Sequence, residues 1–383
     1  MRIGIDARFA VRSRRGIGNY TLGLINHLAE LDHQNEYLLY VDSDDQERVL
    51  PTQENFRARK IGPANYAVWE QLLLPARAKE DRVDVLHCTG NTAPILLDRR
   101  IRLVVTIHDM MYLKTGSLLP RSACRHQRLG RVYRSVIVPR AARHAARVVT
   151  VSHFSKEEIL THLPFLRDED VVVVYEAGND TYHPLDRDDA VQQVRCRYGI
   201  SGNYILSLGG IDPRKNTRLL VQSFLELKHQ GTISERLLVV GVPKCAQTMF
   251  FDHADSSTCR GETLFLDFVS EEDLLLLYNG ATVFVYPSLF EGFGLPPLEA
   301  MACGTPVISS NTTSIPEIAG DGALLIDPTD GNCLKRVLAD LLHDRCLCEQ
   351  LTRRGFDRVR QFSWQKTAAE TLAVYESLLQ ERL

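Results

Sequence analysis

Short apolar runs alternate with helical patterns along the chain, and this alternation constrains the fold more than any other feature. A short apolar run between turn signals is typical of a buried parallel strand, and the helical pattern that follows is typical of a crossover connection. Strands are predicted over residues 2–5, 37–41, 83–87, 103–108, 148–151 and 171–175, and again over 204–208, 237–240, 264–268, 283–286, 307–309 and 323–326. The alternation therefore predicts an α/β chain with two Rossmann-like, doubly wound parallel sheets, each covered by helices.

The length of 383 residues is enough for two domains that each bury a core. We place the domains at residues 1–180 and 181–362, because the segment between them is polar and irregular, and we predict a closing helix over residues 363–383. Ligands of open α/β sheets bind beyond the carboxyl ends of the strands. Two such domains facing each other would leave a cleft between these edges, so residues at strand ends are the candidates for function.

Two helix starts carry the pattern of a capping box, in which a serine is followed three residues later by an acidic side chain. Ser155 precedes Glu158 in this way, and Ser270 precedes Asp273. We expect each serine to cap a helix.

The composition is that of an ordinary globular protein, with 44% hydrophobic and 24% charged residues. A formal net charge of −3 argues against a protein coated in nucleic acid. The nine cysteines are scattered without a Cys-x-x-Cys pair, which predicts reduced thiols in a cytosol. The N-terminus opens as a strand without a signal-peptide pattern, and no apolar run approaches the ~18–20 residues of a membrane span. We therefore expect a cytoplasmic protein that meets a membrane only from the surface.

Charge is unevenly distributed along the chain. Residues 1–180 contain 26 Lys and Arg against 22 Asp and Glu, whereas residues 181–383 contain 19 against 26. No acidic residue occurs between Asp109 and Glu157. The candidates in this window for contact with an anionic ligand are Arg121, Arg125, Arg128 and Arg131. Two interpretations stay open: a solvated basic helix, or a surface for acidic lipid headgroups or a lipid diphosphate, where each cation contributes ~1 kcal/mol.

A cationic turn follows the first predicted strand of the second domain. This strand ends in Gly209-Gly210, and Arg214 and Lys215 come next, before a helix that begins near Thr217. Glycines let the backbone approach a phosphate, while arginine and lysine supply charge that suits a diphosphate. Neighbouring cations are often plain surface charges, but their position after a strand end favours an anion site.

The stretch after the predicted strand 283–286 carries the strongest signal. Glu291 lies in a glycine-rich loop, and Glu299 lies one turn inside the helix that the prolines after Leu295 begin. The N–H groups of Phe293, Gly294 and Leu295 would point towards the same edge. Amides for an anion and carboxylates for hydroxyl groups suit a sugar nucleotide. Two glutamates at this spacing also occur by chance, but the surrounding GFGLPP context does not.

The first domain contributes two further candidates. Gly16 and Gly18 precede a helix, but Thr21 replaces the third glycine of the dinucleotide fingerprint, so NAD binding is disfavoured and a flexible turn is the competing interpretation. His108 ends a predicted strand and therefore has a better claim than the other histidines to lie beside a reacting group.

Together these residues resemble a family 4 glycosyltransferase of the GT-B fold class, and the resemblance covers almost the whole chain. In the second domain, Glu291 and Glu299 match the E-x7-E signature of the family, and Gly209-Gly210 with Pro213–Asn216 resembles its diphosphate-binding turn. In the first domain, Arg15–Thr21 and Trp69-Glu70-Gln71 resemble motifs of mannosyltransferase-like members, and Val105–Asp109 and Val149–Ser152 resemble strand ends of the family. The helix after Ser363-Trp364 resembles the closing helix of the family. Tyr175–Asp180 differs from the tighter N-G-[IV]-D turn that the family more often shows.

The resemblance implies a role for each candidate. It implies that Arg214 and Lys215 bind the donor diphosphate with the backbone of Gly16 and the turn at Gly210, and that Glu299 accepts from the ribose hydroxyls. Glu291 and the amides from Phe293 to Leu295 would hold the donor sugar, and His108 would border the reacting sugar carbon. Phe268 and Val269, after Asp267, would flank the base.

The resemblance also implies a reaction. It implies a hexosyltransferase that retains the donor configuration and moves mannose from GDP-mannose to a polyprenyl-diphosphate-linked glycan or similar polysaccharide precursor, with a UDP-sugar as the rival donor. The first domain would bind the acceptor, the second the sugar nucleotide, and the closing helix would pack back on the first. Arg214 and Lys215 would meet the charge on the leaving diphosphate, so no metal or other cofactor is expected. The acidic pairs Asp42–Asp44 and Asp186–Asp188 lie in polar loops and are disfavoured as metal ligands.

Two other functions stay open at this point. A sugar-nucleotide epimerase on the same fold would convert the donor without an acceptor. A binding module without catalysis would hold a sugar nucleotide or a lipid, although it would have little use for all four of Arg214, Lys215, Glu291 and Glu299.

Overall fold

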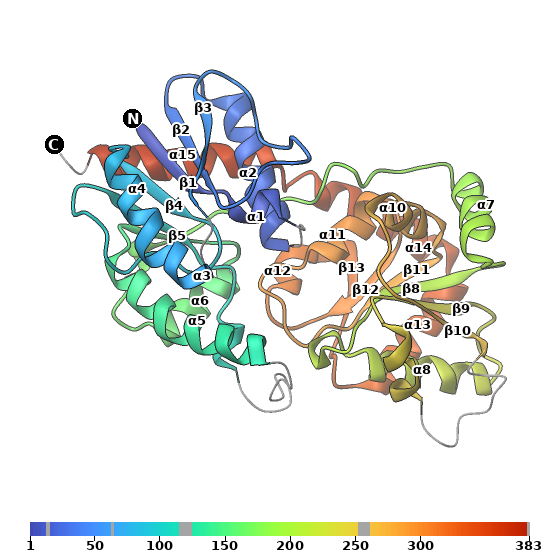
Figure 1. The fold of residues 1–383 in the computed structure, drawn as a ribbon. Helices are drawn as coiled ribbons and strands as arrows, with labels where there is room; N and C mark the ends of the chain where they lie inside the picture. The colour runs from blue at the N-terminus through green and yellow to red at the C-terminus, as the bar shows by residue number, and fades with distance from the viewer. Residues whose placement is uncertain (13–15, 63–64, 115–124, 252–260, 381–383) are drawn as a thin grey trace. The chain divides into compact units, whose positions relative to one another are not determined.

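The computed structural model describes residues 1–12, 16–62, 65–114, 125–251 and 261–380, with the side chains of residues 125–128 outside the description. The chain divides into two compact units (Figure 1). The first comprises the described parts of residues 1–177 and of the closing segment Phe362–Leu383, and the second comprises the described parts of Gly178–Gln361. Each unit contains one parallel sheet covered by helices, which confirms the α/β prediction.

The sheet of the first unit has the order β3-β2-β1-β4-β5-β6-β7, with every neighbouring pair parallel. Its strands are β1 (Arg2–Asp6), β2 (Glu36–Val41), β3 (Phe56–Lys60), β4 (Val85–Cys88), β5 (Arg102–Thr106), β6 (Arg147–Thr150) and β7 (Val171–Val173). One strand of this sheet, β3, was not among the strands predicted from the sequence. This edge strand reads FRARK and buries only Phe56 fully, so it lacks the apolar run of a central strand.

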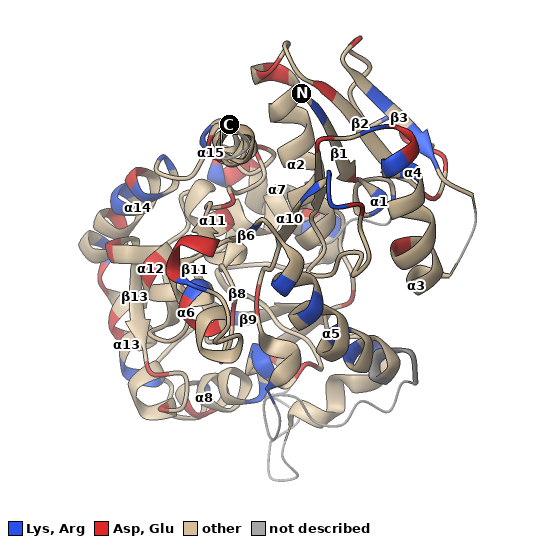
Figure 2. Ribbon diagram, turned by 90° about the vertical axis from the view of Figure 1, so that its left-hand side faces the viewer, with Lys and Arg blue, Asp and Glu red and all other residues tan. Residues whose placement is uncertain are grey.

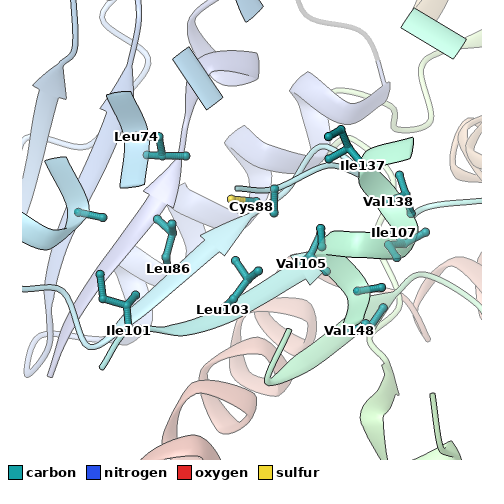
Figure 3. Close-up of a cluster of buried hydrophobic side chains, with 14 of the residues drawn as sticks. Leu74, Leu86, Cys88, Ile101, Leu103, Val105, Ile107, Ile137, Val138 and Val148 are labelled. Carbon is teal, nitrogen blue, oxygen red and sulfur yellow. The ribbon is translucent and has the colours of Figure 1, made fainter. Parts of the chain in front are cut away.

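Helices cover both faces of this sheet. They are α1 (Arg8–Val11), α2 (Gly16–Leu31), α3 (Tyr66–Val68), α4 (Leu74–Glu80), α5 (Arg125–His144), α6 (His153–His162) and α15 (Trp364–Gln380), and a π-helical turn over Trp69–Leu73 joins α3 to α4. The core on one face packs the side chains of β4 and β5 against α4 and α5 (Figure 3). Leu86, Leu103 and Val105 lie at its centre and are at most 2% exposed.

The two predicted capping boxes have different outcomes. Ser270 caps α10 (Glu271–Gly280), because its hydroxyl oxygen accepts from the Asp273 N–H at 3.1 Å. The prediction for Ser155 is wrong: α6 begins earlier, and Ser152 is its cap. The hydroxyl of Ser152 accepts from the Ser155 N–H at 3.1 Å, so Ser155 lies inside the first turn.

The closing helix α15 packs on the first unit alongside α2 (Figure 1). Its Tyr375 is fully buried, and the Tyr375 hydroxyl lies 2.6 Å from His87 Nδ1 on β4. Near the start of the helix, the Trp364 ring covers Gly23 so closely that a Cβ there would lie 2.6 Å from Trp364 Cε2. Because Gly23 has no side chain, the Trp364 indole can pack directly against the backbone of α2.

The sheet of the second unit has the order β10-β9-β8-β11-β12-β13, again parallel throughout. Its strands are β8 (Tyr204–Leu208), β9 (Arg236–Val240), β10 (Thr263–Leu266), β11 (Val283–Tyr286), β12 (Val307–Ser310) and β13 (Ala323–Ile326). Its other helices are α7 (Arg187–Tyr198), α8 (Thr217–His229), α11 (Leu295–Ala302), α12 (Ile315–Ala319), α13 (Gly331–His343) and α14 (Arg345–Val359). The strand order reverses between β8 and β11, and in such sheets ligands bind at this switch point.

Within the described residues, no helix combines the length and the apolar character that a membrane crossing requires.

We predict that Gly23→Ala destabilises the first unit. The added methyl group gains helix propensity but overlaps the buried Trp364 ring, and overpacking of this kind costs about 1–3 kcal/mol. Urea unfolding measures the effect. Gly130→Ala is the matched control, because Gly130 lies in α5 with open space around it, so the same change there raises stability by about 0.5–1 kcal/mol. Equal stabilisation by the two variants would contradict the packing argument.

Candidate active site

The cationic turn follows β8 at the switch point of the second sheet. A single 3-10 turn, Pro213–Lys215, carries both cations, and Asp212 caps it by accepting from the Arg214 N–H at 3.0 Å. The Asp212 carboxylate also accepts from Arg214 Nε and Nη2 at 2.9 and 2.7 Å. Asn216 adopts the left-handed conformation, with φ 54°, and its side chain donates to the Pro287 carbonyl at 3.1 Å. The turn is therefore fixed locally and tied to the loop after β11.

That loop brings Glu291 to the cationic turn. Lys215 Nζ lies 3.0 Å from Glu291 Oε1, so two predicted residues that are far apart in sequence meet beyond the ends of β8 and β11. The hydroxyls of Tyr286 and Ser288 also donate to Glu291 Oε1, at 2.7 and 2.8 Å. Lys215 Nζ contacts the Tyr286 hydroxyl as well and lies 4.7 Å from the centre of its ring. Three donors thus converge on one carboxylate oxygen.

The charges of this cluster stabilise one another. Burial acts to raise the pKa of Glu291, but the charge of Lys215 and the hydrogen bond from Tyr286 hold it below its ordinary value. Burial and the same carboxylate raise the pKa of the Tyr286 hydroxyl, which stays protonated. Arg214 keeps a raised pKa beside Asp212 although burial acts to lower it. The site holds two cations and an ionised Glu291.

The glycine-rich loop and α11 present backbone amides at the same edge. Gly294 has φ 115°, and a Cβ at this position would lie 2.6 Å from Ile315 Cδ1, so only glycine fits here. It precedes Leu295 at the start of α11, where no side chain caps the helix. Phe293 is buried. The N-terminus of α11, with its partial positive charge, is suited to an anionic or hydroxyl-rich ligand.

Glu299 has a different hydrogen-bond partner from Glu291, although the charge of Lys215 also acts on it. Its Oε2 accepts from the Tyr278 hydroxyl at 3.0 Å, and burial raises the pKa of Glu299 to about 7. This carboxyl group therefore changes its protonation near neutral pH, whereas Glu291 stays ionised.

The predicted base-binding segment lies outside a strand. β10 ends at Leu266, so the prediction that this strand continues to Phe268 is wrong. The Phe268 N–H donates to Asp267 Oδ1 at 2.9 Å, and the Phe268 ring is 85% exposed. Val269 is half-buried beside it.

In the first unit, His108 lies beyond the end of β5 and is held by its neighbours. Its N–H donates to Asn91 Oδ1 at 2.7 Å, and its Nε2 lies 2.9 Å from the Thr89 carbonyl. The Tyr20 ring of α2 packs edge-on against the imidazole at 4.7 Å. Burial lowers the pKa of His108 to about 4, so the imidazole is neutral at neutral pH. Gly16 begins α2 one turn before Tyr20 and is exposed.

The segment between Asp109 and Glu157, which contains no acidic residue, includes α5. α5 contains several arginines and no lysine or acidic residue (Figure 2). Arg131 is a structural residue, because its guanidinium donates to the Tyr112 and Lys114 carbonyls. Arg121 lies outside the described residues, as do the side chains of Arg125 and Arg128. An apolar stripe is exposed on the same helix, with Leu129 at 67%, Val132 at 61% and Val136 at 42%.

Several residues that build these sites were not predicted from the sequence. Tyr286 and Tyr278 read as core positions in apolar runs, although each hydroxyl bonds a glutamate. The first unit also contains a buried ionic cluster that was not predicted, in which Arg8 Nη2 lies 2.6 Å from Asp6 Oδ2 and 3.3 Å from Glu70 Oε1. Arg8 also stacks over the Trp69 ring at 3.9 Å. The sequence features that could have indicated this cluster are Asp6 at the end of β1 and the adjacent Trp69 and Glu70.

Comparison with known proteins agrees with the fold. Residues 199–358 match the model "Glycosyl transferases group 1", and residues 14–177 match "Glycosyltransferase Family 4". The O-antigen chain mannosyltransferase B of Escherichia coli is 30% identical over 376 residues, covering 95% of this chain and 96% of that protein. The chain therefore belongs to the family 4 glycosyltransferases of the GT-B fold class.

Solved structures share the fold at low sequence identity. Sucrose-phosphate synthase from Thermosynechococcus elongatus superposes with a TM-score of 0.71 at 19% identity, covering 99% of each chain. Anabaena HepE, solved in complex with UDP and glucose, gives a TM-score of 0.71 at 16% identity, covering 98% of this chain and 100% of that one. The likeness to both shows the GT-B fold.

We predict a pH-dependent loss of stability for Lys215→Met. At pH 7 the variant leaves ionised Glu291 half-buried without its main counter-charge, so the free energy of unfolding falls by about 2 kcal/mol. The lowered pKa of Glu291 stabilises the folded state above its unfolded pKa, and this contribution is lost as the pH falls through the folded pKa. The difference between variant and wild type therefore shrinks towards pH 4.

Urea unfolding at pH 7 and pH 4 measures this difference. Lys335→Met is the control, because Lys335 pairs with the exposed Glu226, and a surface pair contributes at most about 1 kcal/mol. A loss for Lys215→Met that is equal at both pH values would show that Glu291 does not depend on the cation.

Proposed function

We propose that this glycosyltransferase transfers a hexose, mannose from GDP-mannose, to a lipid-linked glycan or polysaccharide precursor with retention of configuration. The single observation that carries the proposal is the contact between Lys215 and Glu291. In the proposal, Lys215 binds the donor diphosphate and Glu291 binds the donor sugar. The mannose donor and the glycan acceptor are supported by the O-antigen mannosyltransferase that is similar over nearly the whole chain.

The proposed reaction breaks the bond between the anomeric carbon and a phosphate oxygen, and forms one from that carbon to an acceptor oxygen. Negative charge develops on the leaving diphosphate, where Arg214 and Lys215 are preorganised to stabilise it. Positive charge develops on the sugar ring, whose hydroxyls Glu291 orients. The leaving phosphate oxygen takes the acceptor proton on the same face. With these cations in place, the proposal requires no metal or other cofactor.

The remaining residues bind the two ends of the donor. Glu299 accepts hydrogen bonds from the ribose hydroxyls, Phe268 and Val269 flank the base, and the amides from Phe293 to Leu295 hold the sugar. Gly16 in the first unit contributes backbone to the diphosphate, and the neutral imidazole of His108 borders the reacting carbon. A neutral imidazole there adds no charge that would oppose an oxocarbenium-like sugar.

The proposal predicts transfer from GDP-mannose to a polyprenyl-diphosphate-linked acceptor by the purified full chain. Lys215→Ala and Glu291→Ala each reduce kcat/KM by about 10²–10³, because each removes a group that acts on the reacting bond. Lys335→Ala, at an exposed ion pair on α13, is the control and leaves the rate unchanged. Radiolabelled donor and product separation measure the transfer.

The same assay separates the alternatives. Transfer only from a UDP-sugar would replace the donor in the proposal while keeping the enzyme class. Conversion of the donor without an acceptor would indicate an epimerase. Binding of a sugar nucleotide without any conversion would indicate a module without catalysis.

We also propose that α5 attaches the protein to the cytoplasmic face of a membrane, where a lipid-linked acceptor lies. The support is the exposed stripe of Leu129, Val132 and Val136 on a helix without acidic residues. An apolar stripe beside cations suits an interfacial helix on anionic lipid.

Flotation with anionic vesicles tests this attachment. We predict that a Val132→Asp, Val136→Asp variant loses binding, whereas a variant with the exposed Leu72 on the π-helical turn changed to aspartate still floats. Arg131 is a poor choice of variant, since its loss would also free the chain around Lys114. Undiminished flotation of the double variant would exclude this face of α5 as the membrane-binding surface.

A further inference from the structure

The turn between β12 and α12, residues 311–314, forms hydrogen bonds to the backbone of the loop between β11 and α11, residues 287–294. Thr313 Oγ1 accepts from the Glu291 N–H at 3.3 Å, and Ser314 Oγ donates to the Glu291 carbonyl at 3.0 Å. Ser314 Oγ also lies 2.7 Å from the Phe293 carbonyl. Both backbone polar groups of Glu291 therefore depend on two consecutive residues of this turn.

This turn is energetically costly. Thr313 has φ 61°, a left-handed conformation that is a genuine outlier for a β-branched residue. Among the described residues, the neighbouring Thr312 hydroxyl oxygen is buried without a hydrogen-bond partner. Strained residues of this kind persist where the surroundings impose them, and they gather at functional sites. Glycine would remove the strain, but it would also remove the oxygen that accepts from Glu291.

The side chains of this turn form hydrogen bonds with one segment of the site, the segment that contains Glu291 and Phe293. Within the described chain, the side-chain hydrogen bonds of Thr313 and Ser314 reach Glu291 and Phe293, and none reaches Lys215 or Glu299. Ile315, directly after the turn, occupies the space that a side chain at Gly294 would need. The turn therefore acts on the segment that would face the sugar and leaves the nucleotide-binding residues alone.

We propose that Thr313 is a positioning residue for the donor sugar: its strained turn holds the Glu291 backbone, and so directs the Glu291 carboxylate at the hexose hydroxyls. The inference rests on the proposed function, in which Glu291 binds the sugar. A small displacement of such a carboxylate is enough to weaken the hydrogen bonds that select one hexose over another.

Thr313→Gly tests the role with the full chain, GDP and GDP-mannose. The expected result is an unfolding midpoint no lower than that of the wild type, since the strain is relieved. GDP, which lacks the hexose, binds within about twofold of the wild type, whereas kcat/KM for GDP-mannose falls by at least about tenfold. The preference for GDP-mannose over GDP-glucose falls as well.

Two further variants complete the experiment. Thr313→Ser keeps the hydroxyl oxygen and retains kcat/KM within about threefold of the wild type. Arg48→Gly is the control variant, because Arg48 also has a positive φ, of 55°, but is exposed and lies in the first unit. This variant changes neither GDP binding nor turnover.

Two outcomes would overturn this inference and leave the proposed function intact. Thr313→Gly with wild-type turnover and wild-type sugar preference would show that the turn does not direct Glu291. An equal loss of GDP and GDP-mannose binding with a lower unfolding midpoint would show a purely structural role. A wild-type chain that binds no sugar nucleotide would instead overturn the proposed function, and the inference with it.

Discussion

The ion pair between Lys215 and Glu291 is the interaction on which the second unit's site depends. A cation and a carboxylate that are both removed from most of the solvent require each other, because an unpaired charge there would be costly. Tyr286 and Ser288 complete the pairing by donating to the same carboxylate oxygen. The loops after β8 and β11 are thereby fixed to each other at the point where ligands bind in such a sheet.

Further segments support this arrangement from outside. Asp212 orients Arg214 beside the pair, and Asn216 ties the cationic turn to the Pro287 carbonyl. The strained turn between β12 and α12 holds the opposite side of Glu291. Two loops and one turn therefore preorganise a small set of charges, which is how an enzyme stabilises charge that develops on a leaving group.

The first unit is organised on a different principle. Its charges at the sheet edge are buried and internally paired, as in the cluster of Asp6, Arg8 and Glu70. The imidazole of His108 is neutral, and packing against Tyr20 and the carbonyl of Thr89 holds it in place.

The sequence by itself determined the α/β class and most strands, and it predicted Lys215 and Glu291 as candidates at strand ends, which the structure brings into contact. Buried parallel strands must be apolar, and Lys215 and Glu291 each follow such a strand in a segment that contains glycines, so the strands and these candidates can be recognised from local sequence. Only the tertiary structure decided that Tyr286 bonds Glu291, that Thr313 is strained and that Ser152 rather than Ser155 caps α6. A tyrosine in an apolar strand looks like core whether or not its hydroxyl has a partner, and a hydrogen bond between distant segments depends on how the strands are ordered, which local composition does not encode.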